Sequence, residues 1–217
     1  MSSSYEKIFI SDLDECIVRC DLKWIEKIKA NYKDFGLTED FLKIPRKTFD
    51  EREIYHLNKN YNLENIEKFE ELYYEDETFY DDIEITPLGE FLIELVNTKG
   101  FKVVVVSTSK FTDDTVPIVK SKKKFLNKYF KDWHIVDSNK KKINVIRNYQ
   151  WFGIIEDSKE VIHSVCDHYL TYLPEDSLPL HGRELLMPPY GWNIPTDEEE
   201  QKFRKVFSNI LYLSPDQ

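Results

Sequence analysis

The sequence predicts an α/β fold in which helices cover both faces of a parallel sheet. Three short apolar runs that each end in a polar cluster have the length and composition of buried strands: Lys7–Ser11, Phe101–Ser109 and Trp151–Ser158. Four consecutive valines, Val103–Val106, suit a strand that is buried on both faces, as in a parallel sheet. Helical patterns lie between the runs, and this alternation implies right-handed strand–helix–strand crossovers.

Two stretches beside the valine run carry the signals of helices. The segment PLGEFLIELVNTKG, residues 87–100, has Pro87 near its start and Gly100 at its end. The segment DDTVPIVKSKKKFLNKYF, residues 113–130, follows the valine strand with helical spacing. A further helix is expected from Lys159, with Asp157 or Ser158 as its N-terminal cap.

Residues 21–84 differ from the rest of the chain in composition. They are rich in Lys, Glu, Tyr and Leu, and helical spacing relates Trp24, Ile25, Ile28 and Tyr32. A chain of 217 residues is long enough for one domain with an inserted subdomain. We therefore expect a core formed by residues 1–20 and 85–217, and a helical cap formed by residues 21–84, called the cap segment below.

Composition narrows the classes of function. A net charge of −10 disfavours a nucleic-acid polymer as partner, because such binders neutralise phosphates with surplus Lys and Arg. The three cysteines, Cys16, Cys20 and Cys166, have no metal-type spacing and read as reduced thiols. No apolar run approaches a membrane span, and the opening MSSSYEK lacks the features of a signal peptide, so we expect a cytoplasmic protein without a membrane partner.

Polar side chains follow each of the three predicted strands. Ligands of open α/β sheets bind outside the carboxyl ends of the strands, so these side chains are expected to converge on one site. Carboxylates brought together in this way repel one another, and Mg²⁺ is the cation that all-oxygen ligands favour. The converging residues are Asp12 and Asp14, Ser107 and Thr108, and Glu156 and Asp157.

Three motifs in this order resemble the haloacid dehalogenase superfamily. DLDEC is similar to its D-x-D-x-[TV] signature, VVVVSTSK to its second motif and GIIEDS to its acidic fourth motif. The resemblance implies a Rossmann-like three-layer core with a helical C1-type cap after the first strand. It also implies that Asp12 is the nucleophile, which forms an aspartyl phosphate, and that Asp14 is the general acid/base.

The same resemblance implies the remaining site residues. Mg²⁺ would be bound by the Asp12 carboxylate, the backbone carbonyl of Asp14 and Asp157, with Glu156 supporting these ligands or acting through water. Ser107 would donate a hydrogen bond to the phosphoryl oxygens, and Thr108 would lie beside the substrate. The third motif requires a lysine, for which we favour Lys122 over a lysine of the run Lys140–Lys142.

Within the superfamily the chain looks most like the 5'(3')-deoxyribonucleotidases. This likeness rests on the length and place of the cap segment, on YEDETFYDDIEITPLGEFL before the second strand and on KKKFLNKYF after it. It implies a nucleoside monophosphate as the substrate, hydrolysed with Mg²⁺. Five residues in or next to the cap segment could recognise the nucleoside, of which we favour Arg19 and Trp24 over Phe49, Tyr55 and Tyr73.

The sequence departs from the family pattern at three positions. Glu15 stands where the family usually has Gly, Cys16 where it has Val or Thr, and Glu156 where it has Asp. Glu15 would recharge the side of the site that faces the cap, which bears on nucleoside specificity more than on the chemistry.

Other functions remain open at this stage. A polynucleotide 3'-phosphatase shares the motifs but conflicts with the acidic charge. A protein phosphatase is suggested by DLDE, although the carboxy-terminal-domain phosphatases that share it lack a cap of this size. A non-catalytic binding or regulatory protein on the same fold has no reason to keep two repelling carboxylates, Asp12 and Asp14. A homodimer is also possible.

Overall fold

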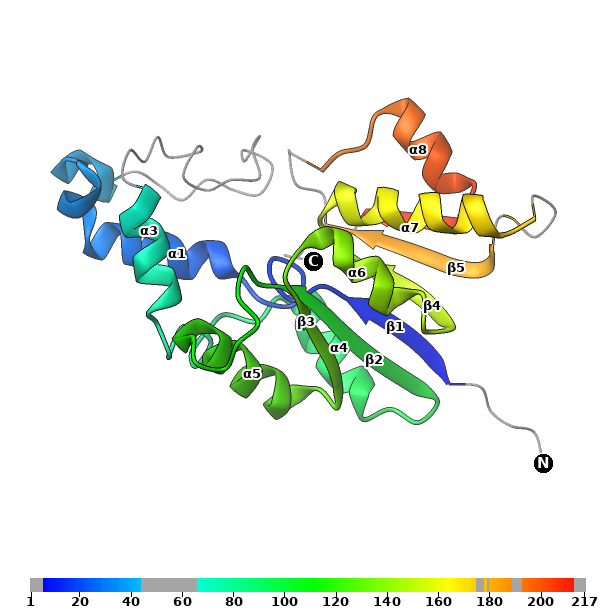
Figure 1. Ribbon diagram of the computed structural model, residues 1–217, viewed down its shortest axis with the longest axis horizontal. Coiled ribbons are helices and arrows are strands. Elements are labelled where there is room, and N and C mark those ends of the chain that lie inside the picture. Colours follow the sequence, from blue (N-terminus) through cyan, green and yellow to red (C-terminus); the bar gives the residue numbers. More distant parts are fainter. Residues whose placement is uncertain (1–5, 44–65, 175–177, 179, 189–192, 213–217) are drawn as a thin grey trace.

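A computed structural model describes residues 6–43, 66–174, 178, 180–188 and 193–212. These residues contain one six-stranded sheet in which all neighbouring strands run parallel, in the order β3-β2-β1-β4-β5-β6 (Figure 1). The order reverses direction between β1 and β4, which is where open α/β sheets bind their ligands. The strands are β1 (Lys7–Ser11), β2 (Phe101–Thr108), β3 (Asp132–Val136), β4 (Trp151–Ile155), β5 (Leu180–Met187) and β6 (Phe207–Tyr212).

Two hydrophobic clusters on opposite faces of the sheet give a three-layer core. Val103 and Val105 of β2 pack in the cluster that contains α4 (Pro87–Val96) and α5 (Pro117–Tyr129). Val104 and Val106 pack in the cluster that contains α6 (Asn139–Ile146), α7 (Lys159–Tyr172) and α8 (Asp197–Arg204). The alternation follows because successive strand residues point to opposite faces, and it confirms the predicted α/β class.

The three predicted strands are present, and three others were not anticipated. β1 has the predicted bounds, while β2 and β4 end one and three residues earlier than predicted. The strands β3, β5 and β6 escaped prediction because they lie outside the three adjacent strands β2-β1-β4 and carry polar residues among their apolar ones. Figure 1 shows β5 and β3 toward the two sides of the sheet.

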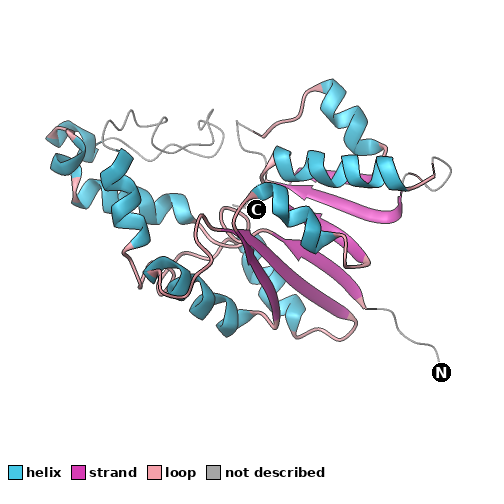
Figure 2. Cartoon of the chain, in the orientation of Figure 1, coloured by secondary structure: helices cyan, strands magenta, loops and turns pink. Residues whose placement is uncertain are grey.

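The described part of the cap segment is helical and lies at the carboxyl ends of the strands (Figure 2). It contains α1 (Cys20–Ala30), the 3₁₀ turns η1 (Tyr32–Phe35) and η2 (Glu39–Lys43), and α3 (Ile66–Tyr74). Trp24, Ile25 and Ile28 are buried on one face of α1, as their spacing predicts, whereas Tyr32 falls in η1. No helix of the described ranges has the length and apolar composition needed to cross a membrane.

The start of α4 fixes the loop that follows β1. Thr86, at the N-cap, accepts a hydrogen bond from the Gly89 backbone N–H (2.8 Å) and donates one to the Cys16 carbonyl (2.7 Å). A Cβ on Gly89 would lie 2.2 Å from the Ile17 carbonyl oxygen, so only glycine permits this approach. The loop 12–19 is thereby attached to the core. Cys16, Cys20 and Cys166 are buried free thiols.

Candidate active site

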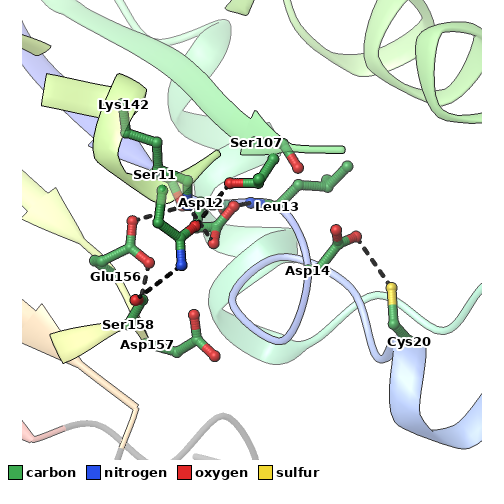
Figure 3. Close-up of polar contacts among 12 residues, drawn as sticks. Ser11, Asp12, Leu13, Asp14, Cys20, Ser107, Lys142, Glu156, Asp157 and Ser158 are labelled. Carbon is green, nitrogen blue, oxygen red and sulfur yellow. Dashed lines mark hydrogen bonds and ion pairs between the residues drawn. The ribbon is translucent and has the colours of Figure 1, made fainter. Parts of the chain in front are cut away.

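Three carboxylates meet at the point where the strand order reverses. Asp12 follows β1, and its backbone N–H donates to the Ile155 carbonyl at the end of β4 (2.9 Å). Glu156 and Asp157 follow β4 directly and are 2% exposed. Carboxylate oxygens of Asp12, Glu156 and Asp157 lie within 4.8 Å of one another, and Figure 3 shows them facing a common space. The predicted convergence of the β1 and β4 ends is therefore present in the structure.

Lys142 of α6 supplies a positive charge to this group. Its Nζ lies 2.6 Å from Oδ2 of Asp12 and 3.0 Å from Oε2 of Glu156, and its side chain is completely buried. Burial acts to lower the pKa of Lys142, but the charges of Asp12 and Glu156 outweigh burial and raise it. Lys142 is therefore held as an ammonium ion.

One lysine does not neutralise three carboxylates. Burial, and then the charge of Asp12, raise the pKa of Asp157 well above its usual range. Burial also raises the pKa of Glu156, despite the opposing charge of Lys142. Among the described residues, no lysine or arginine forms an ion pair with Asp157. Three converging oxygen donors with uncompensated negative charge fit a hard divalent cation such as Mg²⁺.

Asp14 occupies a separate position beside the three carboxylates. Its side chain turns toward Cys20 (Figure 3), whose Sγ lies 3.0 Å from Oδ1. The hydroxyl of Tyr80 donates to the same oxygen (2.7 Å), while Nζ of Lys122 lies 2.6 Å from Oδ2. Burial acts to raise the pKa of Asp14, but the charge and hydrogen bond of Lys122 prevail and lower it. Asp14 is therefore ionised in this arrangement.

Both lysine candidates reach the site, but each contacts a different aspartate. Lys122 donates hydrogen bonds to Oγ of Ser107 and to the Thr108 carbonyl, both at 3.0 Å, in addition to its contact with Asp14. Lys142, which belongs to the run placed second, contacts Asp12. The two lysines are therefore not alternatives for one position.

A cavity of about 560 Å³ opens over the aspartates. Thr108 lines it and donates a hydrogen bond from Oγ1 to Oδ1 of Asn139 (2.8 Å), whereas Ser107 is completely buried behind it. Asn139 in turn donates to Oγ of Ser158 (3.2 Å), so that the ends of β2, β3 and β4 are connected. The residues lining the cavity are Asp12, Asp14, Glu15, Tyr73, Thr108, Ser109, Lys110, Ser138, Asn139, Lys140, Asp157 and Glu160.

The two residues favoured for nucleoside recognition do not line this cavity. Arg19 is buried and pairs with Glu84 (3.5 Å). Trp24 packs its ring against the rings of Tyr73 and Phe79, with centroids 4.3 and 4.9 Å apart. Tyr73, which was given less weight, is the one of the five candidates that lines the cavity among the described residues. Phe49 and Tyr55 lie outside the described residues.

Glu15 has a local structural role that its sequence position did not indicate. Its φ of +61° lies in the left-handed region, which explains why glycine is favoured at this position in the family that the motif resembles. Its Oε1 accepts a hydrogen bond from the backbone N–H of Asp21 (2.8 Å) in the first turn of α1. Glu15 therefore caps α1 from the loop while it lines the cavity.

The predicted start of α7 at Lys159 is confirmed, whereas its predicted side-chain cap is wrong. Ser158 occupies the N-cap position, but its side chain makes no capping hydrogen bond. Its hydroxyl accepts the hydrogen bond from Asn139 instead, which serves the site rather than the helix.

Comparisons with known proteins bear on the fold. No protein-family model matches the chain, and no curated protein matches it by sequence. A proposed haloacid dehalogenase-like hydrolase from Burkholderia xenovorans is 11% identical over 98% of this chain and 94% of that chain, with a TM-score of 0.55. A proposed phosphatase from Clostridium difficile is 16% identical over 95% and 94%, with a TM-score of 0.54.

The chain has the haloacid dehalogenase fold. A proposed β-phosphoglucomutase from Thermotoga maritima shares this fold with 14% identity over 97% of this chain and 95% of that chain, at a TM-score of 0.50. These proteins are named for different activities, so the haloacid dehalogenase fold by itself does not select a substrate for this chain.

Proposed function

We propose that this protein is a Mg²⁺-dependent phosphomonoester hydrolase that forms an aspartyl phosphate on Asp12. One observation carries the proposal: Asp12 lies at the strand-order reversal, paired with buried Lys142 and grouped with Glu156 and Asp157. A carboxylate with a fixed cation beside it and a phosphoryl group in front of it can act as a nucleophile. The haloacid dehalogenase fold, found in proteins described as phosphatases, supports the same reaction class.

Asp12 is held in a defined direction for this attack. The Leu13 backbone N–H donates to its Oδ1 (2.7 Å), and Lys142 pairs with its Oδ2. Each oxygen keeps a further lone pair, so either one remains able to attack phosphorus. The bond from phosphorus to the leaving oxygen then breaks.

Asp14 supplies and recovers the proton of the reaction. In the first step its carboxyl group gives a proton to the leaving alcohol, and in the second its carboxylate takes a proton from the water that cleaves the aspartyl phosphate. A dianionic phosphate arriving beside Asp14 favours the protonated form that the first step needs, because a like charge raises the pKa of a carboxyl group. The net reaction converts a phosphomonoester and water into an alcohol and phosphate.

The residues present fit the metal that this chemistry implies. Mg²⁺ would be held by the carboxylates of Asp12 and Asp157 and by the backbone carbonyl of Asp14, with Glu156 adjacent, and it would offset the charge of the phosphoryl group. Lys122 and Lys142 add two fixed positive charges to the same end of the sheet.

For the substrate we propose a nucleoside monophosphate. The cavity volume of about 560 Å³ is in the usual range for small-molecule sites, and Tyr73 offers it an aromatic side chain for a base. Lys110 and Lys140 also line the cavity, whereas Glu15 and Glu160 add negative charge that disfavours a polyanionic strand.

The experiment measures phosphate release from ribo- and deoxynucleoside 2', 3' and 5' monophosphates, p-nitrophenyl phosphate and a 3'-phosphorylated oligonucleotide, with and without Mg²⁺. Asp12→Asn should lose about 10³-fold or more in turnover and keep its folded structure, since only one oxygen is exchanged. Asp114→Asn, at an exposed aspartate with 72% of its side chain accessible, is the matched control and should keep full activity.

The outcomes test separately the two parts of the proposal, the hydrolase reaction and the nucleotide substrate. Mg²⁺-dependent turnover of one nucleotide supports both the reaction and the substrate. Turnover of p-nitrophenyl phosphate alone supports the hydrolase and contradicts the nucleotidase. Release by Asp12→Asn at the wild-type rate, or silence across the panel, contradicts the hydrolase.

A further inference from the structure

Tyr80 lies at the junction of the cap segment and the core, 66 residues from Asp14 in sequence. Its side chain is buried, with 2% of the residue exposed, and its hydroxyl donates a hydrogen bond of 2.7 Å to Oδ1 of Asp14. Tyr80 lies in the stretch YEDETFYDDIEITPLGEFL, on which the nucleotidase likeness rests, but the likeness assigned it no role. A buried tyrosine hydroxyl normally has a partner, and here that partner is the carboxylate assigned to proton transfer.

The position of Tyr80 is itself fixed by α5. The backbone N–H of Tyr80 donates to Oγ of Ser121 (2.9 Å), and the next residue, Lys122, contacts Asp14. The Tyr80 ring also packs against Phe79 and Phe125, with centroids 5.1 and 6.2 Å away. Two adjacent residues of α5 thus hold the pair in place, because Ser121 binds the Tyr80 backbone and Lys122 binds the Asp14 carboxylate.

The donors around Asp14 divide between its two oxygens. Oδ2 receives the ammonium group of Lys122, and Oδ1 receives the Tyr80 hydroxyl together with the Cys20 thiol. A thiol is a weak donor, so Tyr80 supplies most of the directional restraint on Oδ1. Because the contacts reach both oxygens, rotation of the carboxylate about its own axis is restrained.

Tyr80 also connects Asp14 to the cavity wall. Its ring packs against Phe79, and the Phe79 ring packs edge-on against Tyr73 with centroids 5.7 Å apart; Tyr73 lines the cavity. Tyr73 belongs to α3 of the cap segment, so this short chain of side chains runs from the cap to the proton-transfer residue.

We infer that Tyr80 is a positioning residue, which orients the Asp14 carboxyl group for proton transfer to the leaving oxygen of the substrate. This inference rests on the proposed function. General acid catalysis contributes about 10²–10⁴-fold to a rate, and it depends on the donor lying within hydrogen-bond reach. Loss of orientation therefore matters most when the leaving group is a poor one that requires the proton.

The test compares Tyr80→Phe with the wild-type protein on two substrates. One is a nucleoside monophosphate, whose alkoxide leaving group needs a proton, and the other is p-nitrophenyl phosphate, whose stable phenolate does not. The quantity measured is kcat/KM, because it reports only the steps up to departure of the leaving group. We expect Tyr80→Phe to lose about tenfold or more on the nucleotide and less than about threefold on p-nitrophenyl phosphate.

The matched control is Tyr149→Phe. The Tyr149 hydroxyl likewise contacts a carboxylate, at 3.2 Å from Asp132 on β3, but outside the site. This variant should leave both kcat/KM values unchanged. If Tyr80→Phe fails to fold, the same comparison is made with Ser121→Ala, which removes the hydrogen bond to the Tyr80 backbone N–H. Ser121→Ala should also lose more kcat/KM on the nucleotide than on p-nitrophenyl phosphate, by a smaller factor than Tyr80→Phe.

Equal losses on both substrates, or no loss on either, would overturn the role of Tyr80 and leave the proposed function standing. A wild-type protein inactive on both substrates would overturn the proposed function and this inference with it.

Discussion

The ammonium group of Lys142 lies 2.6 Å from Oδ2 of Asp12 and 3.0 Å from Oε2 of Glu156. One buried positive charge is therefore shared between two carboxylates, while Asp157 adds a third negative charge to the group. Burial, together with this imbalance, raises the pKa of Asp157, and the arrangement leads to two predictions about stability and metal binding.

Removal of Lys142 should destabilise the protein strongly. Lys142→Met keeps most of the side-chain volume but leaves Asp12 and Glu156 buried without their cation, which should cost about 3–5 kcal/mol. Lys141→Met is the control, because its i,i+4 pair with Asp137 is exposed and contributes about 0.5 kcal/mol or less. Urea denaturation of both variants measures the difference, and equal stabilities would show that Lys142 does not compensate the carboxylates.

Loss of Asp157 should have opposite effects without and with Mg²⁺. Burial and the charge of Asp12 disfavour the ionised form, so Asp157→Asn should stabilise the metal-free protein by about 1 kcal/mol. At a Mg²⁺ concentration 100 times its Kd the wild-type protein should gain about 2.7 kcal/mol, or about 5–10 °C in Tm. Thermal unfolding of both proteins tests this, and a Mg²⁺-induced rise in Tm that survives Asp157→Asn would remove Asp157 from the ligands.

Thr86 should matter for both stability and turnover. Thr86→Val removes the cap of α4 and the hydrogen bond to the Cys16 carbonyl inside the core, at a cost of about 1–3 kcal/mol. Because that bond fixes the loop bearing Asp12 and Asp14, kcat should fall as well. Thr196→Val, which removes the cap of α8, should cost about 1 kcal/mol and leave kcat unchanged. Equal kcat values for the two variants would contradict a role of Thr86 in holding the loop.

Glu199 should make stability depend on pH in the acid range. Burial acts to raise its pKa, but hydrogen bonds from the Thr196 backbone, His163 and Lys159 lower it from the ordinary 4.5 to about 2. A lowered pKa in the folded state stabilises the protein above pH 4.5, and this contribution is lost as the pH falls to about 2.

Glu199→Gln should therefore be less stable than the wild-type protein at pH 7, by about 0.5–1 kcal/mol, and equally stable near pH 2. Urea denaturation at several pH values follows the difference. Glu198→Gln, at an exposed neighbour, should show no such pH dependence. A difference for Glu199→Gln that persists unchanged at pH 2 would rule out the ionised pairs as its source.

The central sheet and the acidic group were predictable because local patterns encode them. The valine run of β2 can only be buried on both faces, and polar residues directly after β1 and β4 must lie at the same edge of a parallel sheet. The outer strands were not predictable in this way. β5 contains Arg183, whose guanidinium lies over the Trp151 ring, 4.1 Å from its centroid. A charged residue therefore occupies a position in β5 where the sequence pattern of a buried strand would have an apolar one.

The remaining parts of the site depend on contacts between distant segments. Tyr80 reaches Asp14 across 66 positions, and nothing in its immediate sequence marks this. Lys142 was not separable from Lys140 and Lys141 in sequence, because only the rotation of α6 decides which of them is buried. Arg19 and Trp24 were favoured for their closeness to the loop in sequence, yet both are buried in other contacts, Arg19 beside Glu84 and Trp24 against the rings of Tyr73 and Phe79.

The most direct test of the account is to trap the phosphoenzyme. The wild-type protein is mixed with Mg²⁺ and a ³²P-labelled phosphomonoester that it hydrolyses, quenched with acid during turnover and digested, and the labelled peptide is sequenced by mass spectrometry. The account predicts a hydroxylamine-sensitive acyl phosphate on Asp12 that is absent from Asp12→Asn. Label on another residue, or rapid turnover with no trapped label in the wild-type protein while Asp12→Asn remains active, would contradict it.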